Sequence, residues 1–194
     1  MRMRGMRVPT NASLRRGLGF WANLLGYQGV WFLLVSGAAR ASLVVPIAAA
    51  VAFVVVQLIM TAEPRSEGRL VVAALLLGAV TDGVAAALDW LRYASPAPAL
   101  PPQGAPLWIL MLWACFATTI NRSLTVVRGR PWLAAVLGGL GAPLAYSAAA
   151  SGWHAVEWTS PWALVWIGAC WAFALPILVR VNASSTQGQI PRSE

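Results

Sequence analysis

The stretch from Arg69 to Tyr93 (RLVVAALLLGAVTDGVAAALDWLRY) constrains the fold more than any other part of the sequence. The 22 residues between Arg69 and Arg92 would rise about 33 Å as an α-helix, and a bilayer hydrocarbon core is about 30 Å thick. Almost every residue in this run is apolar. The sequence therefore predicts a helix that crosses a membrane.

Two acidic side chains interrupt this apolar run. Asp82 falls near its middle, where a charged side chain costs about 2.5 to 3.5 kcal/mol on insertion scales. Asp89 follows seven residues later, which places it nearly two helical turns on and on almost the same face. We expect both acids to face protein rather than lipid. Asp82 should have hydrogen-bonding partners or carry a proton.

The composition of the whole chain agrees with a membrane protein. Hydrophobic residues make up 59% and charged residues 10% of the sequence, whereas soluble domains average about 25% charged residues. The net charge is +8, but the basic residues, all arginines, stand at the ends of apolar runs, so no nucleic-acid partner is expected. Cys115 and Cys170 have no CxxC spacing and no neighbouring histidine, so neither a metal site nor a cofactor is predicted.

Five further apolar segments have helical length, so the sequence predicts an all-α polytopic bundle of six transmembrane helices. The expected spans are about 20–39, 42–60, 70–91, 107–127, 131–150 and 161–179, within a domain of 20–181. A basic, disordered arm (1–19) should precede the domain and a polar tail (182–194) should follow it. The first span resembles a signal peptide, but its length and the span that follows favour an uncleaved helix. Five prolines between Ala94 and Pro106 predict a stiff, extended external loop.

The arginines predict the orientation of these spans. With the N-terminus inside, the cytoplasmic segments hold twelve arginines, and only Arg40 and Arg92 lie outside. Because cytoplasmic loops are enriched in basic residues, both termini are expected in the cytoplasm, with the protein in the inner membrane of a bacterium.

A group of polar side chains should gather in the cytoplasmic half of the bundle, with Asp82 near the midplane above them. Its other members are Asn23, Gln28, Gln57, Thr118, Asn121 and Arg122. In a continuous fourth helix, the spacing of Thr118, Asn121 and Arg122 puts them on one face. These groups could hold a lipid head group, or they could only join helices through hydrogen bonds of about 0.6 to 2 kcal/mol each. Arg122 could reach Asp82 or extend to the head groups instead.

The fifth predicted span carries a stripe of small residues, which allows close approach of another helix. The stripe consists of Ala134, Gly138, Gly141, Ala142, Ala145 and Ala149. In the loop that follows, His154 and Glu157 could pair as a base and an acid, although a solvated loop explains them better. No catalytic motif is recognisable.

Four segments resemble an uncharacterised family of small bacterial inner-membrane proteins with a domain of unknown function. They are residues 23–38 (NLLGYQGVWFLLVSGA), 82–89 (DGVAAALD), 116–124 (FATTINRSL) and 129–149 (GRPWLAAVLGGLGAPLAYSAA). Relatives of that family occur among genes for fatty-acid modification, so the resemblance implies a lipid-linked role. Since the family has no established active site, it implies no catalytic residue.

Three functions fit these observations. The preferred one is a non-enzymatic accessory that binds membrane lipids or a lipid-modifying partner protein through the polar group. The alternative is a lipid-modifying enzyme that uses Asp82 with Asn121 and Arg122. A small-solute transporter ranks third.

Overall fold

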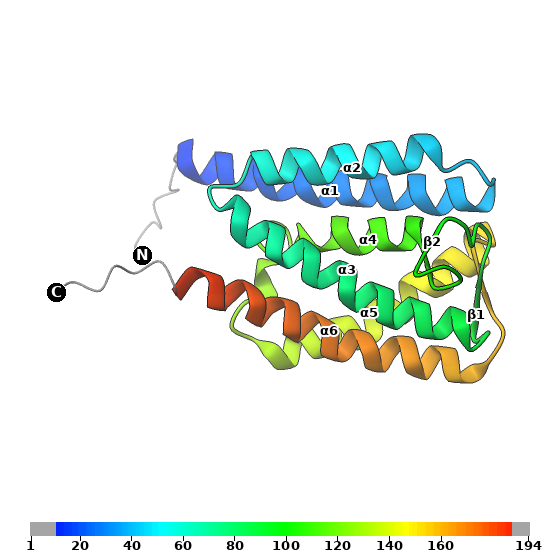
Figure 1. The fold of residues 1–194 in the computed structure, drawn as a ribbon. Coiled ribbons are helices and arrows are strands. Elements are labelled where there is room, and N and C mark those ends of the chain that lie inside the picture. The colour runs from blue at the N-terminus through cyan, green and yellow to red at the C-terminus, as the bar shows by residue number, and fades with distance from the viewer. Residues whose placement is uncertain (1–10, 188–194) are drawn as a thin grey trace, which may run out of the picture.

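The computed structural model describes residues 11–187, and these residues are mostly helical (Figure 1). The six α-helices are α1 (Asn11–Ala39), α2 (Val44–Ile59), α3 (Pro64–Ala87), α4 (Leu107–Ala117), α5 (Pro131–Trp153) and α6 (Pro161–Gln187). Helices α1 and α2 lie side by side along one edge of the bundle, α5 and α6 lie along the other, and α3 and α4 lie between them. The first residues of α1 and the last of α6 lie at the same end of the molecule.

Four of the described helices are long and apolar enough to cross a membrane. They comprise residues 17–39, 64–87, 131–153 and 161–182. Helices α2 and α4 are also apolar but contain only 16 and 11 residues. Many large apolar side chains on the long helices point outward, including Leu76, Leu144 and Phe173. Such a surface suits contact with lipid.

Helices α1 and α6 are longer than the sequence predicted. Helix α1 begins at Asn11 instead of Phe20, and α6 continues to Gln187, into the expected polar tail. Backbone hydrogen bonding in a helix does not depend on a membrane and continues where no residue interrupts it. The rest of the predicted basic arm (1–10) and of the tail (188–194) lies outside the described residues.

Helix α4 is shorter than predicted. The expected span 107–127 is helical only to Ala117, and a turn segment (118–124) and the 3₁₀ helix η1 (Thr125–Val127) follow. The hydroxyls of Thr118 and Thr119 donate to the carbonyls of Cys115 and Phe116, at 2.8 and 2.7 Å. Threonine hydroxyls that bond local carbonyls compete with helix continuation. The expectation that Thr118, Asn121 and Arg122 share one helical face was therefore wrong.

Helix α3 begins and ends earlier than the predicted span 70–91. It ends at Ala87, so Asp89 lies beyond it, in a left-handed backbone conformation (φ 52°). The exposed Asp89 carboxylate forms an ion pair with Arg92, at 2.7 Å. The expectation that Asp89 shares the inward face of Asp82 was wrong, because the helical periodicity stops between them.

Short strands close the end of the bundle opposite the start of α1 and the end of α6, so the fold is not purely helical (Figure 1). Strand β1 (Leu91–Tyr93) pairs antiparallel with β4 (Val156–Trp158), which places Arg92 opposite Glu157. Strands β2 (Ala99–Leu100) and β3 (Ala105–Pro106) form a second antiparallel pair. The proline-rich loop is thus folded back on itself and not fully extended, because its backbone groups pair within the loop.

The small-residue stripe on α5 was predicted to allow close approach of another helix, and at Gly138 that helix is α6. A Cβ atom at Gly138 would lie 2.2 Å from the carbonyl oxygen of Trp171, and one at Gly139 would lie 3.2 Å from Ala172 Cβ. Gly141 differs, because nothing lies within 4 Å of the Cβ position. Gly138 therefore permits the α5–α6 contact, whereas Gly141 borders open space.

Candidate functional site

The turn segment 118–124 is the centre of a polar network that joins it to α1, α2, α3 and α6. Asn23 of α1 donates to the side chain of Gln57 in α2, at 3.2 Å, and to the carbonyl of Thr118, at 3.4 Å. Ser123 donates to Asn23 Oδ1, at 2.6 Å, and Arg122 donates to the carbonyl of Gln57, at 3.0 Å. These bonds hold the irregular backbone of the segment against α1 and α2.

Asn121 extends the same network toward α3 and α6. Its amide donates to Glu67 Oε1, at 3.1 Å, and exchanges two hydrogen bonds with Asn182, at 2.9 and 2.7 Å. Glu67 is buried, and its second oxygen has no hydrogen-bond partner within the described part of the chain. Five of the predicted polar residues thus meet around segment 118–124, but their bonds are directed at one another and at the backbone. That arrangement suits the joining of helices.

Two predicted members do not belong to this network. Gln28 lies exposed on α1. Asp82 is fully buried, as expected, but its partners are other residues, so its predicted grouping with Asn121 and Arg122 was wrong. Arg122 bonds to the α2 backbone instead, because the end of α4 at Ala117 sets the direction of the chain that carries it.

Asp82 accepts three hydrogen bonds from neutral donors. Tyr93 and Tyr146 donate to Oδ1, at 2.8 and 2.5 Å, and Trp113 Nε1 donates to Oδ2, at 2.8 Å. The donors come from β1, α5 and α4, so the carboxylate joins three elements to α3. Gly78, about one turn earlier on α3, makes room for Trp113, whose ring carbon Cδ1 would lie 2.5 Å from a Cβ there.

The sequence did not predict the three donors to Asp82. Tryptophan and tyrosine are common interfacial anchors in membrane proteins, so their residue type alone does not indicate a bond to a buried acid. The donors lie 11, 31 and 64 positions from Asp82, so no local spacing connects them to it. An unpaired acid within a span was the one available signal that such donors exist.

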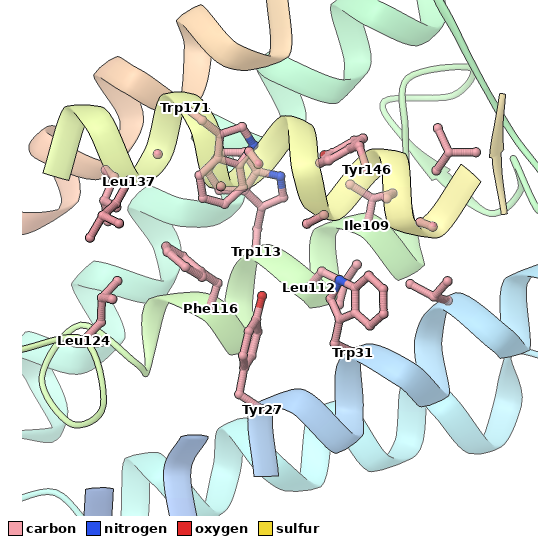
Figure 2. Close-up of a pocket in the computed structure, with 18 of the residues that line it drawn as sticks. Tyr27, Trp31, Ile109, Leu112, Trp113, Phe116, Leu124, Leu137, Tyr146 and Trp171 are labelled. Carbon is pink, nitrogen blue, oxygen red and sulfur yellow. The ribbon is translucent and has the colours of Figure 1, made fainter. Parts of the chain in front are cut away.

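A cavity of about 280 Å³ lies beside this acid, between α1, α4, α5 and α6 (Figure 2). Helix α1 supplies Tyr27, Trp31 and Val35, and α5 supplies several of its small residues. The other lining residues are Trp108, Ile109, Leu112, Trp113, Phe116, Leu124, Leu137, Gly138, Gly141, Ala142, Ala145, Tyr146, Ala149, Val156, Trp171 and Leu175. A single water needs only about 10 to 15 Å³, so the cavity is far larger than a packing defect.

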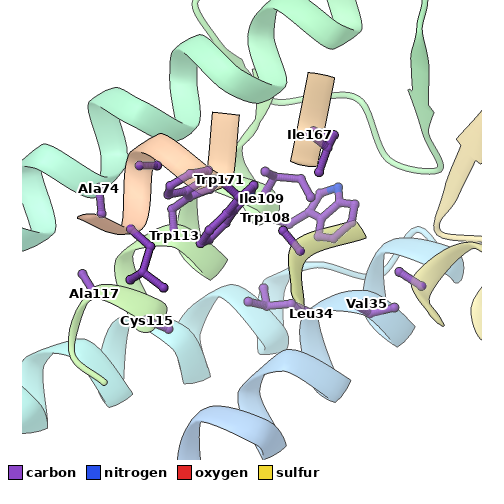
Figure 3. Packing of buried hydrophobic residues seen from close by; sticks show 14 of the residues in the cluster. Leu34, Val35, Ala74, Trp108, Ile109, Trp113, Cys115, Ala117, Ile167 and Trp171 are labelled. Atoms are coloured by element: carbon purple, nitrogen blue, oxygen red, sulfur yellow. The ribbon is translucent and has the colours of Figure 1, made fainter. Parts of the chain in front are cut away.

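The cavity wall is aromatic and uncharged. Seven of the described lining residues are aromatic and none is ionised at neutral pH. Trp113 and Trp171 stack with their ring centroids 3.9 Å apart (Figure 3). The buried indole N–H of Trp171 makes no hydrogen bond to the residues that the structure describes. Two wall residues, Trp113 and Tyr146, bond to Asp82 behind them.

The mouth of the cavity lies between α1 and α5. The lining residues of α6 are buried, whereas Leu137 and Gly141 of α5 are exposed and Tyr27 and Trp31 of α1 are half-buried. Near the end of α5 the two helices are in contact, because Trp153 meets Trp31 edge to face at 5.7 Å. Leucines 25, 140 and 144, on the same two helices, are exposed. The mouth therefore opens on an apolar face of the molecule.

The cavity lining does not include Cys115, His154 or Glu157. Residues 11–187 have no group of three or more His, Cys, Asp or Glu side chains that could hold a metal ion. His154 ends α5 in a left-handed conformation (φ 54°), and Glu157 lies exposed on β4. Cys115 is buried and free, with its thiol donating to the carbonyl of Ala50, at 3.7 Å.

The chain belongs to the family described as "Protein of unknown function (DUF2878)", whose pattern matches residues 20–177. This match confirms the resemblance to an uncharacterised family. No curated protein and no solved structure matches the chain.

Proposed function

We propose that this chain is an integral membrane protein that holds the hydrocarbon part of a membrane lipid in the cavity between α1 and α5. The observation that carries this proposal is an aromatic, uncharged cavity with its mouth on an apolar face. Four helices long enough to cross a bilayer support the membrane location. In a bilayer, the molecules that meet such a mouth are lipids.

The proposed topology has six passes, with both ends in the cytoplasm of a bacterium and the protein in its inner membrane. The arginine distribution supports this orientation, and so does the position of the start of α1 and the end of α6 at one end of the bundle. Helix α4 rises only about 16 Å. Segment 118–124 would complete its crossing, since irregular backbone is tolerated at membrane depth where protein surrounds it.

An accessory role fits the site better than catalysis does. The two oxygens of Asp82 already accept three hydrogen bonds, and the Asn121 and Arg122 side chains are bonded elsewhere. Among the described residues, the cavity wall has no Ser, Thr, Cys or Lys side chain that could act as a nucleophile, and a continuous polar path for a small solute is also lacking there. The protein would then present or store a lipid for a partner enzyme in the same membrane.

A lipid-modifying enzyme is the second candidate, because Tyr146 both lines the cavity and donates to Asp82. A phenol bonded to a carboxylate can exchange a proton with a bound molecule. Lipid extracts of a deletion strain complemented with the wild type or with Asp82→Asn decide between the two. If the protein is an enzyme, Asp82→Asn expressed at the normal level should fail to restore the lipid composition that the deletion alters. If it is an accessory, Asp82→Asn should restore that composition as the wild type does.

The experiment that tests lipid binding uses two matched substitutions on α5. Gly141→Leu places a side chain in the cavity, where nothing lies within 4 Å of the Cβ position, and Ala148→Leu adds the same side chain on an exposed face outside it. Lipids that co-purify with each protein in detergent are extracted and measured by mass spectrometry. We expect Gly141→Leu to lose the bound lipid and Ala148→Leu to keep it. Equal lipid content in both variants contradicts the proposal.

A further inference from the structure

The hydrogen-bonding groups of the cavity wall differ in whether the protein satisfies them. Trp108 Nε1 donates to the carbonyl of Ser95, at 3.1 Å, and Trp113 and Tyr146 donate to Asp82. The donor hydrogens of these three side chains are therefore already bonded within the protein. They offer a bound molecule mainly ring surface.

Tyr27 is the exception among the phenols of the wall. Figure 2 shows its ring extending from α1 into the cavity, with the hydroxyl end directed toward Trp113 and Phe116 of α4. Its hydroxyl has no hydrogen bond to any residue that the structure describes, and its ring meets Phe116 edge to face at 6.0 Å. A phenol hydroxyl that is buried in apolar surroundings without a hydrogen bond destabilises the protein. A polar atom on the bound molecule would satisfy it.

The charges around the cavity determine which polar atom fits. No arginine or histidine lines it, so an anionic group would enter without a counter-ion. An acid, Asp82, lies behind the wall and bonds to Trp113 and Tyr146. An acid there disfavours an anion further, whether as a fatty-acid carboxylate or as a phosphate.

We propose that the cavity selects an uncharged lipid with an ester, ketone or alcohol oxygen and holds that oxygen at the Tyr27 hydroxyl. This inference rests on the proposed function, because it assumes that the cavity holds a lipid, and it adds the ligand class and the residue that recognises it. The hydrocarbon chain of the lipid packs on the aromatic rings. The Tyr27 hydroxyl donates to the ligand oxygen or accepts from a ligand hydroxyl.

The test compares three ligands with the same chain length, namely methyl hexadecanoate, the hexadecanoate anion at pH 8 and hexadecane. Each competes with a photoreactive, uncharged hexadecyl ester for labelling of the full-length protein in detergent. We expect the ester to bind most tightly and the anion most weakly. Tyr27→Phe, which removes one oxygen atom, should weaken the ester about threefold to tenfold and leave hexadecane unchanged.

Each other outcome overturns a different claim. If the anion competes as well as the ester, or if Tyr27→Phe leaves the affinity for the ester unchanged, the selectivity proposed here is wrong although lipid binding stands. If none of the three ligands competes and the probe does not label the cavity, lipid binding itself is wrong. Mass spectrometry of the labelled peptide separates these cases, because labelling within residues 27–35 or 137–149 locates the probe in the cavity.

Discussion

The hydroxyl of Tyr146 lies 2.5 Å from Oδ1 of Asp82 and joins α5 to the buried acid of α3. Tyr146 also lines the cavity, so the hydrogen-bonding of the acid and the shape of the cavity wall depend on the same side chain. A substitution of Tyr146 is therefore expected to change both the partners of Asp82 and the wall of the cavity.

Tyr146→Phe should destabilise the protein by about 1 to 3 kcal/mol, because it removes one of three donors to a buried carboxyl group. Thermal unfolding in detergent measures the effect. Tyr27→Phe is the matched control, because no described residue bonds its hydroxyl, and it should shift the midpoint little. An equal loss in both variants would mean that the bond to Asp82 does not stabilise the fold.

Gly138→Ala should lower stability by about 2 to 3 kcal/mol, since the added Cβ would lie 2.2 Å from the backbone oxygen of Trp171 and would force α5 and α6 apart. Gly141→Ala, three residues on, meets nothing within 4 Å and should be neutral or stabilising. Yield and thermal midpoint of the two variants provide the comparison. The α5–α6 packing described above is incorrect if Gly138→Ala is as stable as Gly141→Ala.

Asn121→Ala should cost about 1 to 3 kcal/mol, because it removes the bonds that connect Glu67 and Asn182 and leaves both buried side chains with fewer partners. Gln28→Ala, at an exposed position on α1, should change stability by less than about 0.5 kcal/mol. Denaturation in detergent is again the measurement. A larger loss of stability in Gln28→Ala than in Asn121→Ala would mean that Gln28 does belong to the polar network.

Asp89 should stay ionised at a pH where an ordinary aspartate is half protonated, about 3.9. Hydrogen bonds from the Arg92 guanidinium, at 2.8 and 2.7 Å, hold the pKa of Asp89 below its ordinary value. Because the folded-state pKa is lowered, the small stabilisation by this exposed pair is complete above the unfolded-state pKa. It is lost as the pH falls through the folded-state pKa.

A carboxyl-carbon NMR titration of Asp89 checks this prediction. Arg92→Ala should return the pKa toward the ordinary aspartate value. If the pKa of Asp89 is the same in the wild type and in Arg92→Ala, the ion pair does not persist in solution.

Some features of the site followed from local sequence and others did not. Asp82 was expected to be buried and partnered because an acid in an apolar helix has few alternatives, and it is. Its donors were missed, since aromatic residues occur on many faces of such a chain. The cavity was missed for a related reason. The stripe of small residues predicted close helix contact, but at Gly141 the neighbouring helix is absent and space remains.

The sequence alone determined that the chain is helical and suited to a membrane, because the length and apolarity of a segment are local properties and the free energy of insertion follows them. The tertiary structure decided where α4 ends, which side chains reach Asp82 and that a cavity separates α1 from α5. These features depend on contacts between residues far apart in the chain. Such contacts are fixed only when helices pack and each buried polar group finds its partner.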